Sequence, residues 1–393
     1  MSKKRETIEN KNNQEEKETL AEIVEPLLRW YDGNRRILPW REEPSPYRVW
    51  VSEIMLQQTR VEAGRDYFER FVKILPNIES LANVRDEQLM KLWEGLGYYN
   101  RARNLKKAAG IIMEQFSGEM PSTYIGLLEL PGIGPYTAGA IASIAFGEAV
   151  PAVDGNVLRV IARIIADYGD ITSSLIKKST EAKLKKILPI NRTGDFNQAL
   201  MELGALVCIP NGAPKCSDCP VSHLCIAFQN NLIGELPVKK QKKPRKLEEK
   251  TMLILKKDHA MALRKRPKTG LLAGLFELPS LSGFLSESEI AFCLSKQGFA
   301  YTTIRPLGDA KHIFSHVEWR MQGYEIEITE LPTKITKSRQ DFCVEESAVN
   351  LDCKEEFGDL IWVKGEALQE EVAIPSAFKP YAHAFPKAKK GGE

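Results

Sequence analysis

Four cysteines fall close together in the chain, with the spacing of a metal-binding loop. They follow the pattern Cys-x7-Cys-x2-Cys-x5-Cys, at Cys208, Cys216, Cys219 and Cys225. Thiolates at such short spacings hold either a [4Fe–4S] cluster or a tetrahedral zinc ion. Zinc ribbons usually carry two Cys-x2-Cys pairs, and this loop has only one. The pattern favours an iron–sulfur cluster, with zinc as the alternative.

One carboxylate interrupts an apolar segment, SPYRVWVSEIMLQQT. Apolar residues recur there at the period of a helix face, at Tyr47, Trp50, Val51 and Ile54. Burial in such a helix raises the pKa of a carboxyl and keeps it protonated near neutrality, as a general acid requires. Glu53 is therefore a candidate general acid. The alternative is a surface carboxylate held in a salt bridge.

A glycine-rich turn lies between two predicted helices in LLELPGIGPYTAGAIASIAF. The second helix is expected to begin at Pro135, a favoured first helical position. Gly132 and Gly134 allow a tight turn whose backbone N–H groups can approach a phosphate. An ordinary connection between two helices of a bundle is the alternative.

A second carboxylate follows that helix in VDGN. Asp154 lies there, some twenty residues after the hairpin glycines, and is a second candidate site residue. Its alternative use is an Asx-turn or a helix cap, which is common for aspartate before glycine.

The surrounding elements indicate a multi-domain chain. Its 393 residues, with 43% hydrophobic content, are too many for one ordinary domain. Residues 20–236 read as helical, residues 237–250 as a basic linker, and residues 251–385 as a smaller α+β domain with strands at TMLIL, MALRKR, YEIEITEL and DLIWV. The ends, 1–19 and 386–393, read as tails.

The charge is unevenly distributed. Residues 1–270 hold 42 Lys and Arg against 33 Asp and Glu, whereas residues 271–393 hold 13 against 19. The basic body indicates a polyanionic partner. No apolar run is long enough for a signal peptide or a membrane span, so we expect an intracellular, cytoplasmic protein with no membrane partner. In a reducing compartment its thiols should stay free.

Several separated blocks resemble known DNA repair enzymes. The helix–hairpin–helix followed by an aspartate resembles the DNA glycosylase superfamily named for those features, and the cysteine loop resembles that of endonuclease III, with one extra residue in the first gap. The blocks LPWR, VWVSEIMLQQTRV, EGLGYYNRARNL, VDGN and FNQAL make the chain similar to MutY-type adenine DNA glycosylases from about Trp40 to Ala384. These enzymes remove adenine mispaired with 8-oxoguanine.

The resemblance implies a role for each matching residue near the reaction. Glu53 would protonate adenine N7, and Asp154 would stay ionised and stabilise the oxocarbenium-like sugar. Tyr136 and Asn156 would flank Asp154 and position water. Bifunctional members place a nucleophilic lysine where this chain has Tyr136, so a monofunctional hydrolase without lyase chemistry through that position is expected. Gly132 and Gly134 would grip the DNA backbone.

The resemblance also implies residues that recognise the bases. Adenine must leave the stack before chemistry can reach it. The adenine pocket would include Trp40, Arg41 and Gln198. Gln58 and Thr59 would form a wedge beside 8-oxoguanine, with Tyr98 stacking opposite and Leu96 packing nearby. Tyr99, Arg101 and Arg103 are expected to be core and phosphate contacts.

The C-terminal part resembles the Nudix-like domain of the same glycosylases. Phe314, Ser315 and His316 match the loop that reads 8-oxoguanine, whose N7 is a donor where guanine N7 is an acceptor. After GLLAGLFELP the chain lacks the Arg-Glu-x-x-Glu-Glu core that binds Mg²⁺ in Nudix hydrolases. Pyrophosphohydrolase activity is therefore not expected.

The resulting hypothesis is a monomeric glycosylase. It would contain a [4Fe–4S] cluster and act on double-stranded DNA carrying A opposite 8-oxoguanine or G. The alternatives are a thymine- or uracil-specific glycosylase, a non-catalytic damage binder, and a Nudix hydrolase with a DNA-binding extension. Two carboxylates at the site argue against pure binding, which needs neither.

Overall fold

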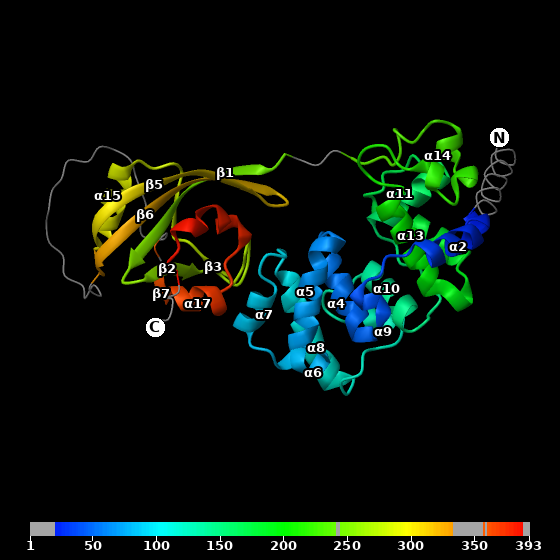
Figure 1. Cartoon of the computed structure of the whole chain (residues 1–393), viewed down its shortest axis with the longest axis horizontal. Helices are drawn as coiled ribbons and strands as arrows, with labels where there is room; N and C mark the ends of the chain where they lie inside the picture. The colour runs from blue at the N-terminus through cyan, green and yellow to red at the C-terminus, as the bar shows by residue number, and fades with distance from the viewer. Residues whose placement is uncertain (1–19, 241–243, 333–356, 358–359, 388–393) are drawn as a thin grey trace. The chain divides into compact units, whose positions relative to one another are not determined.

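The computed structural model describes residues 20–240, 244–332, 357 and 360–387. The chain forms two compact units (Figure 1). The first comprises Met1–Val84 and Asn100–Lys242, and the second comprises Arg85–Tyr99 and Lys243–Glu393. The predicted tail at 1–19, and all but two residues of the tail at 386–393, lie outside the described residues.

The first unit is helical, as predicted. Its helices are α2 (Val24–Asn34), α3 (Pro39–Glu42), α4 (Pro46–Leu56), α5 (Val61–Ile74), α6 (Ile78–Asn83), α8 (Asn100–Gln115), α9 (Tyr124–Leu128), α10 (Pro135–Ala145), α11 (Gly155–Ile164), α12 (Ser174–Lys185), η1 (Ile190–Arg192), α13 (Thr193–Leu206), η2 (Cys216–Asp218), η3 (Ser222–Leu224) and α14 (Ile226–Gln229). None of the helices in the described part of the chain is both long and apolar enough to cross a membrane.

The two helices that flank the predicted chemistry begin as their sequences indicate. Ser45 caps α4 by accepting from the Arg48 backbone N–H, and Pro46 occupies the first turn. The apolar positions of α4 are buried, Trp50 and Val51 almost completely. Helix α10 begins at Pro135 and packs against α4, α9 and α13.

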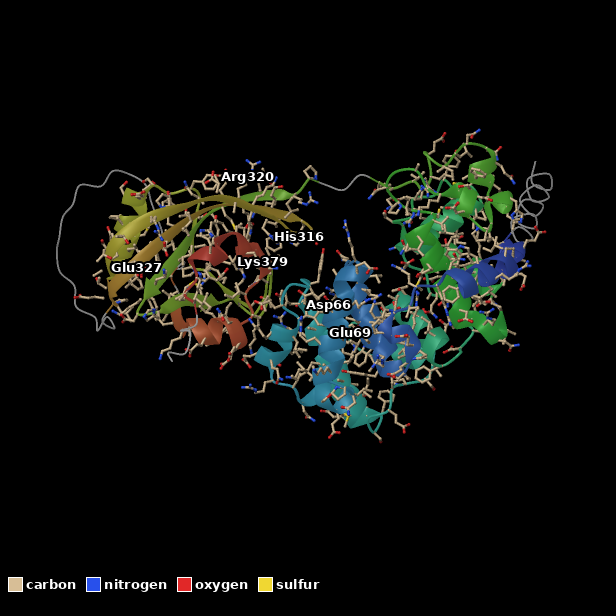
Figure 2. The ribbon with its side chains drawn as sticks, viewed as in Figure 1. Asp66, Glu69, His316, Arg320, Glu327 and Lys379 are labelled. Carbon is tan, nitrogen blue, oxygen red and sulfur yellow. The ribbon has the colours of Figure 1, made fainter. Side chains whose placement is uncertain are left out.

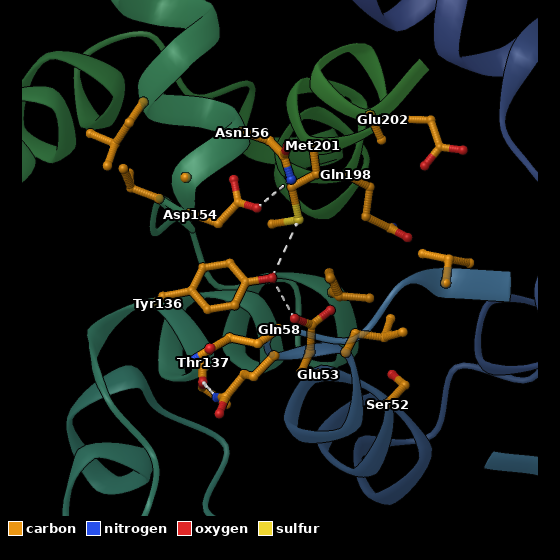
Figure 3. A pocket seen from close by; sticks show the side chains of 18 of the residues that line it. Ser52, Glu53, Gln58, Tyr136, Thr137, Asp154, Asn156, Gln198, Met201 and Glu202 are labelled. Carbon is orange, nitrogen blue, oxygen red and sulfur yellow. Dashed lines mark hydrogen bonds between the residues drawn. The ribbon is translucent and has the colours of Figure 1, made fainter. Parts of the chain in front are cut away.

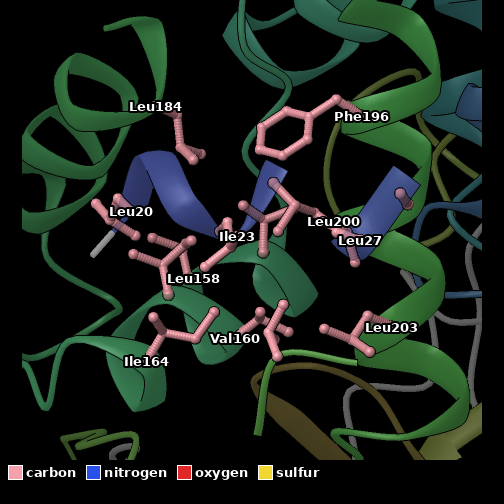
Figure 4. Packing of buried hydrophobic residues seen from close by; sticks show 14 of the residues in the cluster. Leu20, Ile23, Leu27, Leu158, Val160, Ile164, Leu184, Phe196, Leu200 and Leu203 are labelled. Atoms are coloured by element: carbon pink, nitrogen blue, oxygen red, sulfur yellow. The ribbon is translucent and has the colours of Figure 1, made fainter. Parts of the chain in front are cut away.

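One hydrophobic cluster of this unit joins α2, α11 and α13 (Figure 4). Leu27 of α2, Val160 of α11 and Phe196 of α13 are all buried in it. Because α11 begins directly after Asp154, the packing of α11 in this core also positions Asp154.

The second unit contains a mixed sheet. Its elements are α7 (Asp86–Leu92), β1 (Lys246–Lys257), β2 (Ala260–Lys265), β3 (Phe276–Glu277), β4 (Ser280–Ser282), α15 (Glu287–Lys296), β5 (Ala300–Ile313), β6 (Val317–Glu330), β7 (Leu360–Lys364), α17 (Gly365–Glu370) and η4 (Ser376–Ala384). The strand order is β3-β2-β1-β6-β5, with β4 paired to β1 and β7 paired to β2. The β1–β6 pair is parallel and the others are antiparallel.

Both faces of this sheet are buried at β1. Met252 and Ile254 face one cluster with Trp319 of β6, whereas Leu253 and Leu255 face another that includes residues of α15. Successive side chains of a strand point to opposite faces, so both layers form from one short segment.

The predicted linker extends too far. Residues 246–250 form the beginning of β1 and pair with β6 from Val317 onward. Backbone pairing needs no apolar side chain, and Glu248 accepts from the Trp319 indole at 3.0 Å. The charged composition of 246–250 therefore concealed a strand.

Two other features of the second unit were not anticipated. Residues 85–99 belong to it, and Lys91 and Glu94 bind backbone groups of Val372 and Ile374 at 3.1 and 2.8 Å. Cys293 is disulfide-bonded, which contradicts the expectation of free thiols throughout.

Candidate active site

A pocket of about 900 Å³ lies in the first unit (Figure 3). Helices α4, α10, α11 and α13 supply much of its wall. It brings together ten of the predicted site residues: Trp40, Arg41, Glu53, Gln58, Thr59, Gly134, Tyr136, Asp154, Asn156 and Gln198. These residues come from segments far apart in the chain, so the pocket is a product of the fold.

Glu53 lies in the pocket wall with its carboxylate close to the Tyr136 hydroxyl (Figure 3). Burial raises the pKa of Glu53 to about 7. The negative charge of Asp154 raises it further, whereas the hydrogen bond from Tyr136 and the charge of Arg41 lower it. Glu53 can therefore hold a proton near neutrality and release it at the pocket surface.

Tyr136 forms a hydrogen bond with Glu53, a partner that the sequence did not predict. Its hydroxyl donates to Glu53 Oε2 at 2.5 Å and lies 3.6 Å from Met201 Sδ. Burial and the two nearby carboxylates raise the pKa of Tyr136, so it stays a neutral donor. The pairing joins α10 to α4 at the site.

Asp154 is both a helix cap and a pocket residue. One carboxylate oxygen accepts from the Val157 backbone N–H at 2.8 Å, and the other accepts from Asn156 Nδ2 at 2.7 Å. Burial raises the pKa of Asp154, and these two donors lower it. The helix-cap alternative is therefore confirmed, and the same side chain lines the pocket.

A third carboxylate in the pocket wall was missed. Glu202 is almost fully buried, and it receives Arg36 at 2.6 Å and Arg41 at 2.9 Å. Burial raises its pKa, but these hydrogen bonds and charges bring it down to about 2, so Glu202 is ionised and holds Arg41 at the site. The sequence contains a signal for this residue. In LMELGAL, Glu202 interrupts an apolar helical segment, as Glu53 does in its own segment.

The other predicted pocket residues lie at its margin. The Trp40 ring is buried and meets Phe68 edge-on, with ring centroids 5.2 Å apart. Gln58 has φ of +59°, an uncommon backbone conformation at the end of α4. Such backbone strain is concentrated at functional sites.

The segment after Tyr98 differs from expectation. Tyr99 is buried, as predicted for a core residue. Arg101, predicted as a phosphate contact, instead donates to the carbonyls of Ile54, Met55 and Gln57. It thereby binds the carbonyl groups left free at the C-terminus of α4.

The predicted hairpin glycines occupy the turn before α10. Gly134 precedes α10 directly and lines the pocket, and Gly132 lies against Asn104 of α8. Two lysines also line the pocket, Lys177 of α12 and Lys239. Neither occupies the position of Tyr136, where bifunctional members of the resembled superfamily place the nucleophilic lysine.

The remaining predicted recognition residues belong to the second unit. The hydroxyls of Tyr98 and Ser315 are 3.1 Å apart, and Leu96 is buried. Phe314 packs its ring against His312 and Trp319, with centroids 4.6 and 4.9 Å apart. The exposed His316 lies at the tip of the β5–β6 hairpin (Figure 2).

The four clustered cysteines line one small, apolar cavity of the first unit. Arg163 of α11 donates to Cys208 Sγ at 3.2 Å, a contact that suits a thiolate. Within the described ranges, no three His, Cys, Asp or Glu side chains converge closely enough to hold a single metal ion. The thiolates of Cys208, Cys216, Cys219 and Cys225 would be the ligands of an iron–sulfur cluster. The donor set fits such a group.

Family models match two parts of the chain. Residues 51–189 match the HhH-GPD superfamily of base excision DNA repair proteins, and residues 250–384 match the NUDIX domain. A solved thermostable thymine-DNA glycosylase aligns with 29% identity over 56% of this chain and 98% of its own, at a TM-score of 0.49.

Two relatives cover most of the chain. The adenine DNA glycosylase of Mus musculus is 37% identical over 364 residues, 78% of this chain and 70% of its own. That of Buchnera aphidicola subsp. Baizongia pistaciae is 37% identical over 303 residues, 76% of this chain and 84% of its own. Identity at this level across both units shows the family. The chain belongs to the adenine DNA glycosylases, hydrolases that act on N-glycosyl bonds in base excision repair.

Proposed function

We propose that this enzyme removes adenine paired with 8-oxoguanine, or with guanine, by acid-assisted hydrolysis. The observation that carries the proposal is the Glu53–Tyr136 hydrogen bond of 2.5 Å in the pocket that also holds Asp154. A carboxyl whose pKa is about 7 can donate a proton to adenine N7 at neutral pH. The departing base then leaves as a neutral molecule.

Asp154 supplies the complementary charge. As the bond to adenine breaks, the sugar gains positive character, which an adjacent carboxylate stabilises. The Val157 and Asn156 donors favour the ionised form of Asp154 against its burial. Water completes the hydrolysis. Asn156 donates to Asp154 and so orients its carboxylate, and both residues lie across the pocket from Glu53 (Figure 3). No lysine replaces Tyr136, so we propose a monofunctional enzyme.

Recognition divides between the two units. In the first, Trp40, Arg41 and Gln198 would line the flipped adenine, and Gln58 with Thr59 would fill the space left in the duplex. In the second, the hydroxyls of Tyr98 and Ser315 face each other at 3.1 Å. A hydroxyl can accept a hydrogen bond from N7–H of 8-oxoguanine, which guanine lacks.

We also propose that the four clustered cysteines hold a [4Fe–4S] cluster. The cavity they line and the Arg163 donor at Cys208 support this assignment. The cluster would tie the cysteine loop to α11, which begins at the catalytic aspartate. Stoichiometric iron and sulfide with broad visible absorption is the expected result, and stoichiometric zinc in a colourless protein would contradict it.

A substrate panel tests the reaction. Purified enzyme is incubated with duplexes carrying A opposite 8-oxoguanine, A opposite G, T opposite G, or U opposite G, and with free 8-oxo-dGTP. Each duplex sample is then divided, and half is treated with alkali to cleave abasic sites. We expect scission of the adenine strand alone, after alkali alone, and unchanged 8-oxo-dGTP.

Each other pattern rejects one part of the proposal. Scission without alkali, accompanied by borohydride trapping, would reject monofunctional hydrolysis and direct attention to Lys177 and Lys239. Scission at T or U would assign a different base. Conversion of 8-oxo-dGTP would assign hydrolase activity to the second unit.

A further inference from the structure

Asn197 is a buried side chain of α13 that makes three polar contacts. It is 0% exposed. Its Nδ2 donates to Ser143 Oγ at 2.8 Å and to the Val150 carbonyl at 3.0 Å, and its Oδ1 accepts from the Ala152 backbone N–H at 3.1 Å. Both amide hydrogens and the amide oxygen are thus used, which is the full bonding that burial demands.

These contacts fix the conformation of the segment before Asp154. In an extended chain the carbonyl of one residue and the N–H two residues later point to the same side. Asn197 bonds this pair at Val150 and Ala152, as a neighbouring strand would. The segment between α10 and α11 has no helix or strand of its own, so this side chain substitutes for a sheet partner.

The same segment is pressed against α10. Gly139 lies one turn after Tyr136, and a Cβ at Gly139 would be 2.3 Å from the Pro151 carbonyl oxygen. Ser143, which receives Asn197, donates in turn to the Gly139 carbonyl at 2.7 Å. The helix that carries Tyr136 and the segment that leads to Asp154 therefore have one fixed separation.

Helix α13 also holds the far side of Asp154. A Cβ at Gly204 would lie 2.6 Å from Asn156 Cβ, so α13 contacts the start of α11 at Asn156 as well as the preceding segment at Val150 and Ala152. Asp154 lies between these two attachments. Its own bonds go to the neighbouring Asn156 and Val157, which move with it.

We propose that Asn197 is a positioning residue that sets the place of Asp154 opposite Glu53 and Tyr136. The proposal rests on the proposed role of Asp154 in the reaction. Asn197 touches neither base nor sugar, and it acts by joining α13 and α10 to the segment that carries the catalytic carboxylate. Displacement of a reacting group by about 1 Å can cost about 100-fold in rate.

The test compares Asn197→Leu with the full-length wild-type enzyme. Leucine has similar volume and none of the three hydrogen bonds. The rate of adenine release is measured in a single turnover with enzyme in excess, per active molecule, together with the Kd for the A:8-oxoguanine duplex. We expect the rate to fall about 10- to 100-fold while the Kd is unchanged.

The pH–rate profile separates positioning from stability. Asp154 displaced away from Glu53 would raise the pKa of Glu53 less, so the alkaline limb of the profile should move to lower pH in the variant. Thr180→Val is the matched control, because it removes a buried hydroxyl that donates to Ile176 at 2.9 Å within α12. We expect it to lower the Tm without changing the rate or the limb.

Two further variants make the outcome decisive. If Asn197→Leu does not fold, Asn197→Asp keeps the shape and the acceptor for Ala152 but loses amide donors, and its rate should still fall at unchanged Kd. If the variant that folds has the wild-type rate and the wild-type limb of the pH–rate profile, the positioning role is overturned. Asp154→Asn is measured in parallel, and full activity there would instead reject the proposed function.

Discussion

Glu53 keeps a proton that an ordinary glutamate would lose. Burial raises its pKa from 4.5 to about 7, and the unfolded chain does not share that effect. The folded state therefore binds the proton more tightly than the unfolded state. The stability that this group contributes is fully present below about pH 4.5 and is lost as the pH rises through about 7.

Glu53→Gln should remove the loss of stability that ionisation of the buried Glu53 carboxyl causes at high pH. Glutamine can still accept from Tyr136, so the packing of α4 against α10 is retained. We expect the variant to exceed wild type by about 1–3 kcal/mol in free energy of unfolding near pH 8, and by less than about 1 kcal/mol near pH 5. Urea denaturation at the two pH values measures both differences. Equal stabilities near pH 8 would show that Glu53 ionises freely.

Sequence could identify single residues better than their partners. The apolar pattern around Glu53 predicted its burial, and burial predicted its protonation. The Tyr136 contact could not be predicted, because the two residues are separated by 83 positions on different helices. Glu202 also interrupts an apolar helical segment, so its burial could be predicted in the same way. Its two partners, Arg36 and Arg41, could not, because they lie in a distant segment of the chain.

At the scale of elements, small residues let α10 approach its neighbours. Gly139 faces the Pro151 carbonyl directly, so backbone meets backbone where a side chain would normally separate them. Alanine favours a helix interior over glycine by about 1 kcal/mol. Gly139 therefore lowers the stability of the helix but allows the close approach that the geometry of the site requires.

Gly139→Ala tests that interpretation. We expect a loss of about 1–3 kcal/mol in the free energy of unfolding, as for an overpacked core, together with slower adenine release. The matched control is Gly110→Ala in α8, where a Cβ would meet nothing within 4 Å. It should gain about 0.5–1 kcal/mol at unchanged rate. A gain in stability at Gly139 would refute the close approach.

Local sequence predicted elements well where their ends were marked. Ser45, Pro46 and the helical period predicted α4, and Pro135 predicted the start of α10. The beginning of β1 was missed because its parallel partner β6 lies about seventy positions later and the strand there is charged. Long-range pairing leaves no local pattern, so the sequence alone predicts a linker that includes residues 246–250 of β1.

At the scale of the whole molecule, the near-neutral net charge of +3 conceals a basic first part and an acidic end. Composition alone therefore indicated where a polyanion should bind. It could not indicate that residues 85–99 belong with the C-terminal unit. That grouping brings the hydroxyl of Tyr98 to that of Ser315, the residue proposed to distinguish 8-oxoguanine from guanine.

Ser315→Ala should weaken this distinction. Loss of one hydrogen bond, worth about 1 kcal/mol, predicts about a fivefold smaller preference for A:8-oxoguanine over A:G. The ratio of single-turnover rates on the two duplexes measures it. Ser295→Ala, at an exposed position of α15, is the control and should keep the wild-type ratio. An unchanged ratio in Ser315→Ala would remove this loop from recognition.

The central claim is that a protonated Glu53 releases adenine. The most direct measurement is single-turnover adenine release from an A:8-oxoguanine duplex by wild type and by Glu53→Gln, each with its Kd and across the pH range. We predict that the wild-type rate falls as the pH rises through about 7, and that Glu53→Gln binds the duplex but releases no adenine. Normal release by Glu53→Gln would contradict the account.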